Sequence, residues 1–168
     1  MIKAGAKAII RVGTCGTLTD KVGQGDHIVV TAAIREDGVS PLLIPLGYPA
    51  VADSKIADAI EATCQQAGAN YQRGIVLASD CFYPGILPTS LELYSKAGVP
   101  GVEMECATLF VIASLRGIRA GSILTIDGNP LKWNEGNYDP HGTKVTEGKA
   151  RMLTLALKAV SDLSRRNA

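Results

Sequence analysis

Three acidic residues stand where apolar segments of this sequence end. Asp127 directly follows the apolar run 123–126. Burial there would raise the pKa of its carboxyl and let it hold a proton near neutral pH, as a general acid must. Glu103 and Glu105 are two residues apart, so in an extended strand both side chains point to one face and Met104 to the other. Two carboxylates placed in this way are good acceptors for the paired hydroxyls of a sugar. Structural interpretations stay open, because Asp127 also precedes a glycine as in a surface turn, and Glu105 also suits the N-terminus of a following helix.

A second group of candidate residues is centred on a basic side chain. Arg11 lies at the end of the short apolar run 8–12, and Gly13 and Thr14 follow it. A guanidinium in such a place can fork onto a phosphate, helped by backbone N–H groups and by the Thr14 hydroxyl, while the glycine permits close approach of the backbone. The structural alternative is an arginine held in a salt bridge at a strand edge.

Two aromatic residues stand in polar, glycine-containing stretches. Phe82 lies in the segment SDCFYPG, and Trp133, the only tryptophan, lies in a segment rich in Gly and Asn. Such rings pack on a planar ligand or mark an interface between subunits, and the sequence alone leaves both interpretations open.

Alternating strands and helices would position these residues. The hydrophobic pattern predicts strands over 8–12, 26–34, 73–78, 101–104 and 120–126, and helices over 52–67, 89–97, 106–115 and 145–163. The helix at 106–115 is apolar on every side, which is typical of burial in a core or at a subunit contact. The last helix carries an apolar stripe of Met152, Leu153, Ala156, Leu157 and Val160.

This alternation predicts an α/β fold. We expect three layers, α/β/α, around a mixed, largely parallel central sheet, in a single domain over residues 1–168. Because ligands of such folds bind at the carboxyl ends of strands, the polar residues at 11–14, 79–80, 103–105 and 127 are expected to converge on one site.

Composition excludes several other classes of protein. Lys and Arg number 17 against 16 Asp and Glu, which leaves no basic excess for a nucleic-acid surface. No apolar run approaches the ~20 residues that span a bilayer. The four cysteines show neither paired spacing nor a nearby His, so we expect no metal and no disulfide framework, and reduced thiols in the cytoplasm. With 2 histidines, a His-centred triad is not expected.

Four segments of the chain carry a resemblance to a known family. They are RVGTCGTL at 11–18, YPAVAD with SDCFYPG at 48–53 and 79–85, GVEMECATL at 101–109, and ILTIDGNPLKW at 123–133. In these segments, and in their order, the chain resembles the nucleoside phosphorylases that cleave purine nucleosides or uridine. The last segment is similar in particular to the purine phosphorylases of apicomplexan parasites.

The resemblance implies a role for each candidate residue. Asp127 would be the general acid that protonates N7 of the departing purine. Arg11 and Thr14 would bind phosphate, and Glu103, Met104 and Glu105 the ribose. The base would contact five residues: Cys15, Gly16, Phe82, Val102 and Trp133. Inorganic phosphate would be the co-substrate, with no other cofactor.

The resemblance also sets expectations for the chain as a whole. The family begins with a strand and a phosphate loop that we expect this chain to lack, and its members form ring-like oligomers, so a homo-oligomer, by resemblance a hexamer, is expected. Uridine-specific relatives carry Gln and Arg after the FYPG segment, whereas Ile-Leu-Pro-Thr follows Gly85 here, which favours purine. The alternatives are a uridine phosphorylase, a hydrolytic nucleosidase of the same fold, and a non-catalytic fragment that assembles with full-length subunits.

Overall fold

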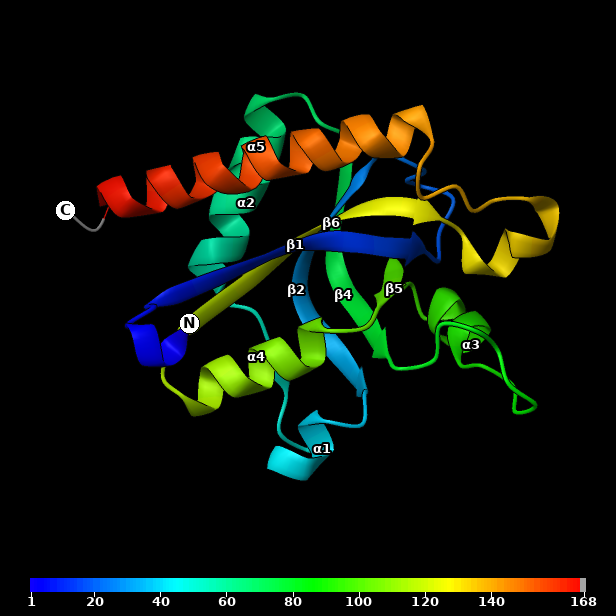
Figure 1. The fold of residues 1–168 in the computed structure, drawn as a ribbon, viewed down its shortest axis with the longest axis horizontal. Helices are drawn as coiled ribbons and strands as arrows, with labels where there is room; N and C mark the ends of the chain where they lie inside the picture. Colours follow the sequence, from blue (N-terminus) through cyan, green and yellow to red (C-terminus); the bar gives the residue numbers. More distant parts are fainter. Residues whose placement is uncertain (167–168) are drawn as a thin grey trace.

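The structure is a computed structural model that describes residues 1–166, so the last two residues of the predicted domain lie outside the described part (Figure 1). The strands are β1 (Ala8–Thr17), β2 (His27–Glu36), β3 (Ala50–Val51), β4 (Tyr71–Ser79), β5 (Gly101–Glu103) and β6 (Arg119–Gly128). The α-helices are α1 (Ser40–Leu43), α2 (Ser54–Gln66), α3 (Leu91–Lys96), α4 (Cys106–Leu115) and α5 (Thr143–Arg166). Two short 3-10 helices, η1 (Ile2–Ala4) and η2 (Pro130–Glu135), complete the description.

The strands form one mixed sheet in the order β3-β2-β4-β5-β1-β6. The two longest ladders, β1–β6 and β2–β4, are parallel, as is β4–β5, whereas β1–β5, β2–β3 and β2–β6 are antiparallel. The predicted α/β class with a mixed sheet and flanking helices is confirmed. The structure adds that β2 also pairs with β6, so that five of the strands close into a barrel-like ring.

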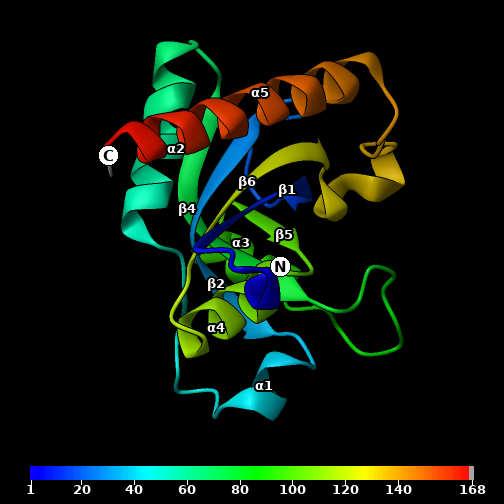
Figure 2. The same ribbon diagram turned by 60° about the vertical axis from the view of Figure 1, so that its left-hand side comes forward.

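Helices cover this ring on two sides (Figure 2). On one side α2 and α5 pack together against Val29 and Ile123 of the sheet. On the other side α4 packs on β2, β3 and β6, with Phe110 and Val111 buried. Within the described range, no helix is long and apolar enough to cross a membrane.

Local sequence accounts for the helix boundaries. Asp53 caps α2 by accepting a hydrogen bond from the Ile56 N–H at 3.0 Å, and Gly68, with φ of 61°, follows the helix end. In α4 the expectation of burial on every side holds for only part of the helix, because Leu115 is 43% exposed.

The predicted apolar stripe of α5 was partly wrong. Met152 and Ala156 are buried as expected, and Leu155 and Ala159 complete the buried face. The other three predicted members lie outside it, with exposed fractions between 46% and 71%: Leu153, Leu157 and Val160. The helix carries more apolar residues than one 3.6-residue stripe can bury, so only its contact with α2 and the sheet decides which of them are covered.

Candidate active site

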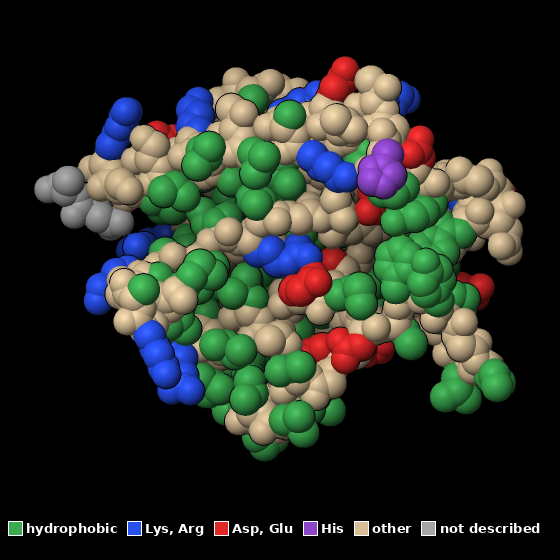
Figure 3. Space-filling view, viewed as in Figure 1, with side chains coloured by type: hydrophobic (Ala, Val, Ile, Leu, Met, Phe, Trp, Pro, Cys, Tyr) green, Lys and Arg blue, Asp and Glu red, His purple; other side chains and the backbone are tan. Residues whose placement is uncertain are grey.

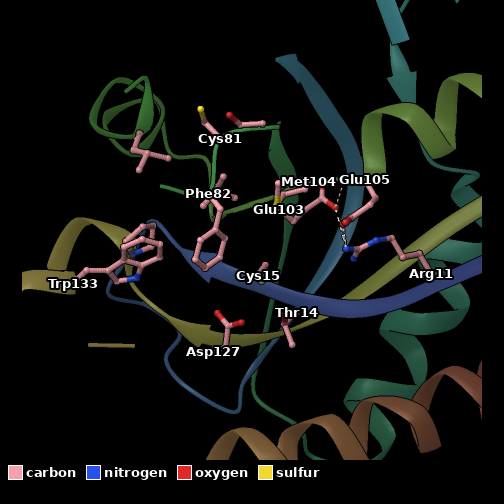
Figure 4. Close-up of a pocket in the computed structure, with 15 residues that line it drawn as sticks. Arg11, Thr14, Cys15, Cys81, Phe82, Glu103, Met104, Glu105, Asp127 and Trp133 are labelled. Atoms are coloured by element: carbon pink, nitrogen blue, oxygen red, sulfur yellow. Dashed lines mark hydrogen bonds and ion pairs between the residues drawn. The ribbon is translucent and has the colours of Figure 1, made fainter. Parts of the chain in front are cut away.

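One cavity is lined by β1, β6 and the ends of β4 and β5 (Figure 4). All of the residues singled out from the sequence line it: Arg11, Thr14, Cys15, Gly16, Phe82, Val102, Glu103, Met104, Glu105, Asp127 and Trp133. The expected convergence therefore holds for these positions. The exception is Asp80, whose carboxylate instead accepts a hydrogen bond from the Gly38 N–H at 2.6 Å.

The Arg11 guanidinium lies beside both glutamates, with one nitrogen directed at their carboxylates (Figure 4). Its Nη2 forms an ion pair with Glu105 and lies 3.5 Å from the Glu103 carboxylate. Nη1 is buried and has no hydrogen-bond partner. A Cβ at residue 13 would lie 2.5 Å from Nη1, so Gly13 leaves the space that the guanidinium occupies. Gly13 thus makes room for the Arg11 side chain, and the N–H groups of Nη1 are left to donate to an anion.

Glu103, rather than Glu105, caps the following helix. Its carboxylate accepts hydrogen bonds from the N–H groups of Glu105, at 2.9 Å, and Cys106, at 3.0 Å. Burial raises the pKa of Glu103, while these N–H groups and Arg11 act in the opposite direction. The Glu105 side chain is 61% exposed and makes no capping bond. The helix-terminus role considered for Glu105 thus belongs to Glu103, which leaves the Glu105 carboxylate at the cavity.

The expectation that Met104 faces away from the glutamates was wrong. Strand β5 ends at Glu103, so the alternation of an extended chain does not continue through Met104. Met104 is 36% exposed and lines the same cavity as its two neighbours.

Asp127 is a buried carboxyl at the end of β6, not a surface turn residue. It is 8% exposed, and burial raises its pKa, against the opposing effects of hydrogen bonding by Thr14, of its own backbone and of the Lys149 charge. Its carbonyl oxygen accepts hydrogen bonds from Gln24 Nε2 at 3.1 Å and from the Asp139 N–H at 3.2 Å. A carboxyl so held, with a raised pKa, is suited to donate a proton.

An aromatic wall, defined here as Phe82, Trp133 and Tyr138, borders the cavity. Ring centroids of Phe82 and Trp133 are 5.2 Å apart, and Tyr138 lies 5.9 Å from Phe82 and 5.3 Å from Trp133. Trp133 Nε1 is buried without a partner. Such a wall can pack on a planar ring and offers one unused N–H donor.

The residues around Gly16 and Cys15 in the cavity are closely packed. Gly16 pairs with Val102 between β1 and β5, and a Cβ at residue 16 would lie 2.7 Å from Pro130 Cδ. Burial, and next the charge of Asp127, raise the pKa of Cys15 well above its ordinary value, so this thiol stays neutral. Among residues 1–166, no cluster of three or more His, Cys, Asp or Glu could hold a metal ion, and all four cysteines are free thiols.

Ser79, which was also expected at the site, lines the cavity. Sequence reasoning missed three further lining residues: Cys81, Leu91 and Pro130. Cys81 and Pro130 lie within the recognised segments, so these segments could have located them. No sequence signal marks Tyr138 or Gln24, because long-range contacts alone bring them to Asp127.

Comparisons with known proteins identify relatives of the chain. A family model described as the phosphorylase superfamily matches residues 1–161. The chain is 44% identical, over 162 residues, to a purine nucleoside phosphorylase of Plasmodium falciparum, and 30% identical, over 172 residues, to a uridine phosphorylase of Escherichia coli. These matches cover 95% and 91% of this chain. The structure of purine nucleoside phosphorylase from Toxoplasma gondii in complex with immucillin-H superposes with a TM-score of 0.93 at 41% identity, over 98% of this chain and 67% of that one.

These relatives are longer than the chain. The matches span 65% of the length of the Plasmodium falciparum protein and 68% of that of the Escherichia coli protein.

Proposed function

Because the chain belongs to the phosphorylase superfamily, we propose that it takes part in the phosphorolysis of purine nucleosides. Phosphate attacks C1′ of the ribose as the bond from C1′ to the base breaks, and the products are the free purine and ribose 1-phosphate. The observation that carries the proposal is that one cavity holds a buried carboxyl of raised pKa, a guanidinium with an unpartnered buried nitrogen, and an aromatic wall.

Asp127 acts as the general acid in this proposal. The departing purine gains negative charge, and a proton given by Asp127 to N7 neutralises it. The burial of Asp127 supports this role, because burial favours the protonated form that a donor needs.

Arg11 and Thr14 bind the phosphate. Support comes from Arg11 Nη1, which has no partner within the described residues, since a buried guanidinium nitrogen is costly to leave unpaired. Thr14 also lines the cavity and hydrogen-bonds with Asp127, so it lies between the acid and the anion site.

The sugar and base fill the remainder of the cavity. The exposed carboxylate of Glu105 accepts bonds from the ribose hydroxyls, and Met104 packs on the sugar with Glu103 beside it. The base packs against Phe82 and Trp133, with further contacts to Cys15, Gly16 and Val102.

Purine is favoured over uridine as the base. The chain is 44% identical to the Plasmodium purine enzyme and 30% identical to the bacterial uridine enzyme. A hydrolytic nucleosidase would need no phosphate clamp, and Arg11 argues against it.

The deciding experiment measures hypoxanthine release from inosine with and without phosphate, and uracil release from uridine. Hypoxanthine released only with phosphate supports the proposal. Equal release without phosphate indicates a hydrolase, and faster uracil release indicates a uridine phosphorylase. If neither base is released while immucillin-H, the ligand of the Toxoplasma structure, still binds, the chain is a non-catalytic nucleoside-binding protein.

We further propose a homo-oligomer, by family resemblance a hexamer, acting in the cytoplasm with phosphate as co-substrate and no other cofactor. Large exposed apolar residues support the oligomer, among them Leu42 in α1, at 85%, and Leu46 shortly after it, at 63%. Hydrophobic side chains also gather on the face shown in Figure 3. Light scattering of the purified chain tests the oligomer, and dialysis against a chelator tests the absence of a metal requirement.

A further inference from the structure

Tyr138 lies beside the site, yet none of the roles proposed above uses it. It follows η2, in the connection that leads to α5, and is 38% exposed. Its ring contacts both Trp133 and Phe82, at centroid distances of 5.3 and 5.9 Å. Tyr138 is therefore the third member of the aromatic wall, and it supports the two rings that line the cavity directly.

The main chain around Tyr138 is attached to the strand end that carries Asp127. Tyr138 forms an antiparallel bridge with Gly128, the Asn129 N–H donates to the Asn137 carbonyl at 2.9 Å, and the Asp139 N–H donates to the Asp127 carbonyl at 3.2 Å. The approach is close, because a Cβ at residue 128 would lie 2.5 Å from the Asn137 carbonyl oxygen and 3.0 Å from Tyr138 Cδ2.

We propose that Tyr138 is a positioning residue that couples the base-binding wall to the proton donor. Its ring holds Trp133 and Phe82 in place. The main chain around it holds the backbone of Asp127, through the bridge to Gly128 and the hydrogen bond from the Asp139 N–H. The segment around Tyr138 thus holds both the wall on which the base packs and Asp127, the acid that gives the base a proton. The kinetic part of this inference depends on the proposed function.

Electrostatics supports this closeness. Burial raises the pKa of the Tyr138 phenol, and the next largest contribution is the charge of Asp127. The phenol therefore lies close enough to Asp127 to be affected by its charge. Removal of the ring would let water reach the buried carboxyl. The proposal assigns no hydrogen bond to the phenol group, so phenylalanine should replace tyrosine without loss.

The test compares Tyr138→Ala, Tyr138→Phe and Tyr138→Leu with the control Tyr83→Ala. Tyr83 also contacts Phe82, at 5.0 Å, but it is 78% exposed, and among the described residues its ring makes no contact with Trp133. Each protein is assayed for inosine KM and kcat against pH. Emission of Trp133, the only tryptophan, gives a readout that needs no activity.

We expect Tyr138→Ala to raise the inosine KM about tenfold, since it removes two aromatic contacts from the wall. It should also move the fall of kcat at high pH to lower pH, because a hydrated Asp127 loses its proton more readily, and shift Trp133 emission to longer wavelength. Tyr138→Phe should match the parent within about twofold. The leucine variant keeps apolar bulk and should fall between these two.

Several results would overturn the proposal. Tyr138→Phe could be as impaired as Tyr138→Ala, or Tyr138→Leu could equal the parent. Tyr138→Ala could also change the inosine KM while the pH profile of kcat and the Trp133 emission stay the same. A Tyr83→Ala variant as impaired as Tyr138→Ala would also overturn it. If the parent itself lacks phosphorolysis, the proposed function fails, while the emission shift and immucillin-H affinity still decide whether Tyr138 organises the wall.

Discussion

The Arg11 guanidinium forms an ion pair with the Glu105 carboxylate, although the two residues are proposed to bind different substrates. Each side chain is the charge partner of the other, while Arg11 Nη1 has no partner among the described residues. Under the proposed function, phosphate that engages Arg11 would compete with Glu105 for the guanidinium and would leave the carboxylate free to accept the ribose hydroxyls. We therefore expect binding of the two substrates to be linked.

Glu105→Gln tests this link. Loss of the charge should strengthen phosphate binding to the free enzyme by as much as about fivefold, because an exposed ion pair contributes about 0–1 kcal/mol. The inosine KM should rise about tenfold or more, since hydrogen bonds to a charged acceptor contribute about 1.5–3 kcal/mol. Calorimetry with phosphate alone and steady-state kinetics measure the two effects. If both affinities fell together, the pair would not be competing with phosphate.

Asp127→Asn should lower kcat for inosine by about 10²–10⁴-fold, because a general acid typically contributes that much. The substitution should not destabilise the folded protein. Burial raises the pKa of Asp127, which means that burial disfavours its ionised form, so a neutral amide should be tolerated at this position. In the parent, activity should fall as the pH rises through this raised pKa. A loss of kcat under tenfold would remove Asp127 from the acid role.

Arg11→Lys should raise the phosphate KM about tenfold or more, with a smaller change in the inosine KM. Lysine keeps the charge but cannot present the forked pair of donors to an oxyanion. Initial rates with each substrate varied in turn separate the two constants. A change confined to the inosine KM would reassign Arg11.

Gly13→Ala should impair phosphate use without unfolding the protein. The added Cβ would lie 2.5 Å from Arg11 Nη1, and the flexible end of the arginine can move away. We expect a several-fold rise in phosphate KM and a Tm within about 3 °C of the parent, because relief by a mobile side chain costs less than overpacking of a core. Gly23→Ala is the control, since nothing lies within 4 Å of that position. Equal phosphate kinetics in both variants would disprove the effect.

His27 should make stability depend on pH between about 6.5 and 4. Its side chain is buried, and desolvation and then the Arg151 charge lower its pKa to about 4. The folded state therefore favours the neutral ring, so this stabilisation is present above the unfolded pKa of about 6.5 and is lost as the pH falls towards 4. The loss should reach about 3 kcal/mol, at 1.36 kcal/mol per pKa unit. Urea unfolding of the parent, His27→Gln and His141→Gln at several pH values measures it. The free energy of unfolding of His27→Gln should vary less with pH in this window. The variant His141→Gln, changed at an exposed residue, should follow the parent.

Several elements could be predicted because their signals are local. The apolar positions Ile56, Ile60 and Cys64 recur at helical spacing and are all buried in α2, and α4 has the predicted bounds. The β-branched run at 28–31 lies within β2 as expected. The short β3 and α1 were missed, because two to four residues carry no measurable periodicity.

For the candidate site, the sequence by itself determined which residue types meet. Arg11, Glu103 and Asp127 each lie in or at the end of an apolar strand, and burial of the strands brings them to one cavity. Only the tertiary structure decided how they are paired. The β2–β6 ladder that closes the sheet and the ion pair from Arg11 to Glu105 join residues far apart in the chain. Such contacts depend on the packing of whole elements against one another, for which hydrophobic periodicity, a property of neighbouring residues, carries no signal.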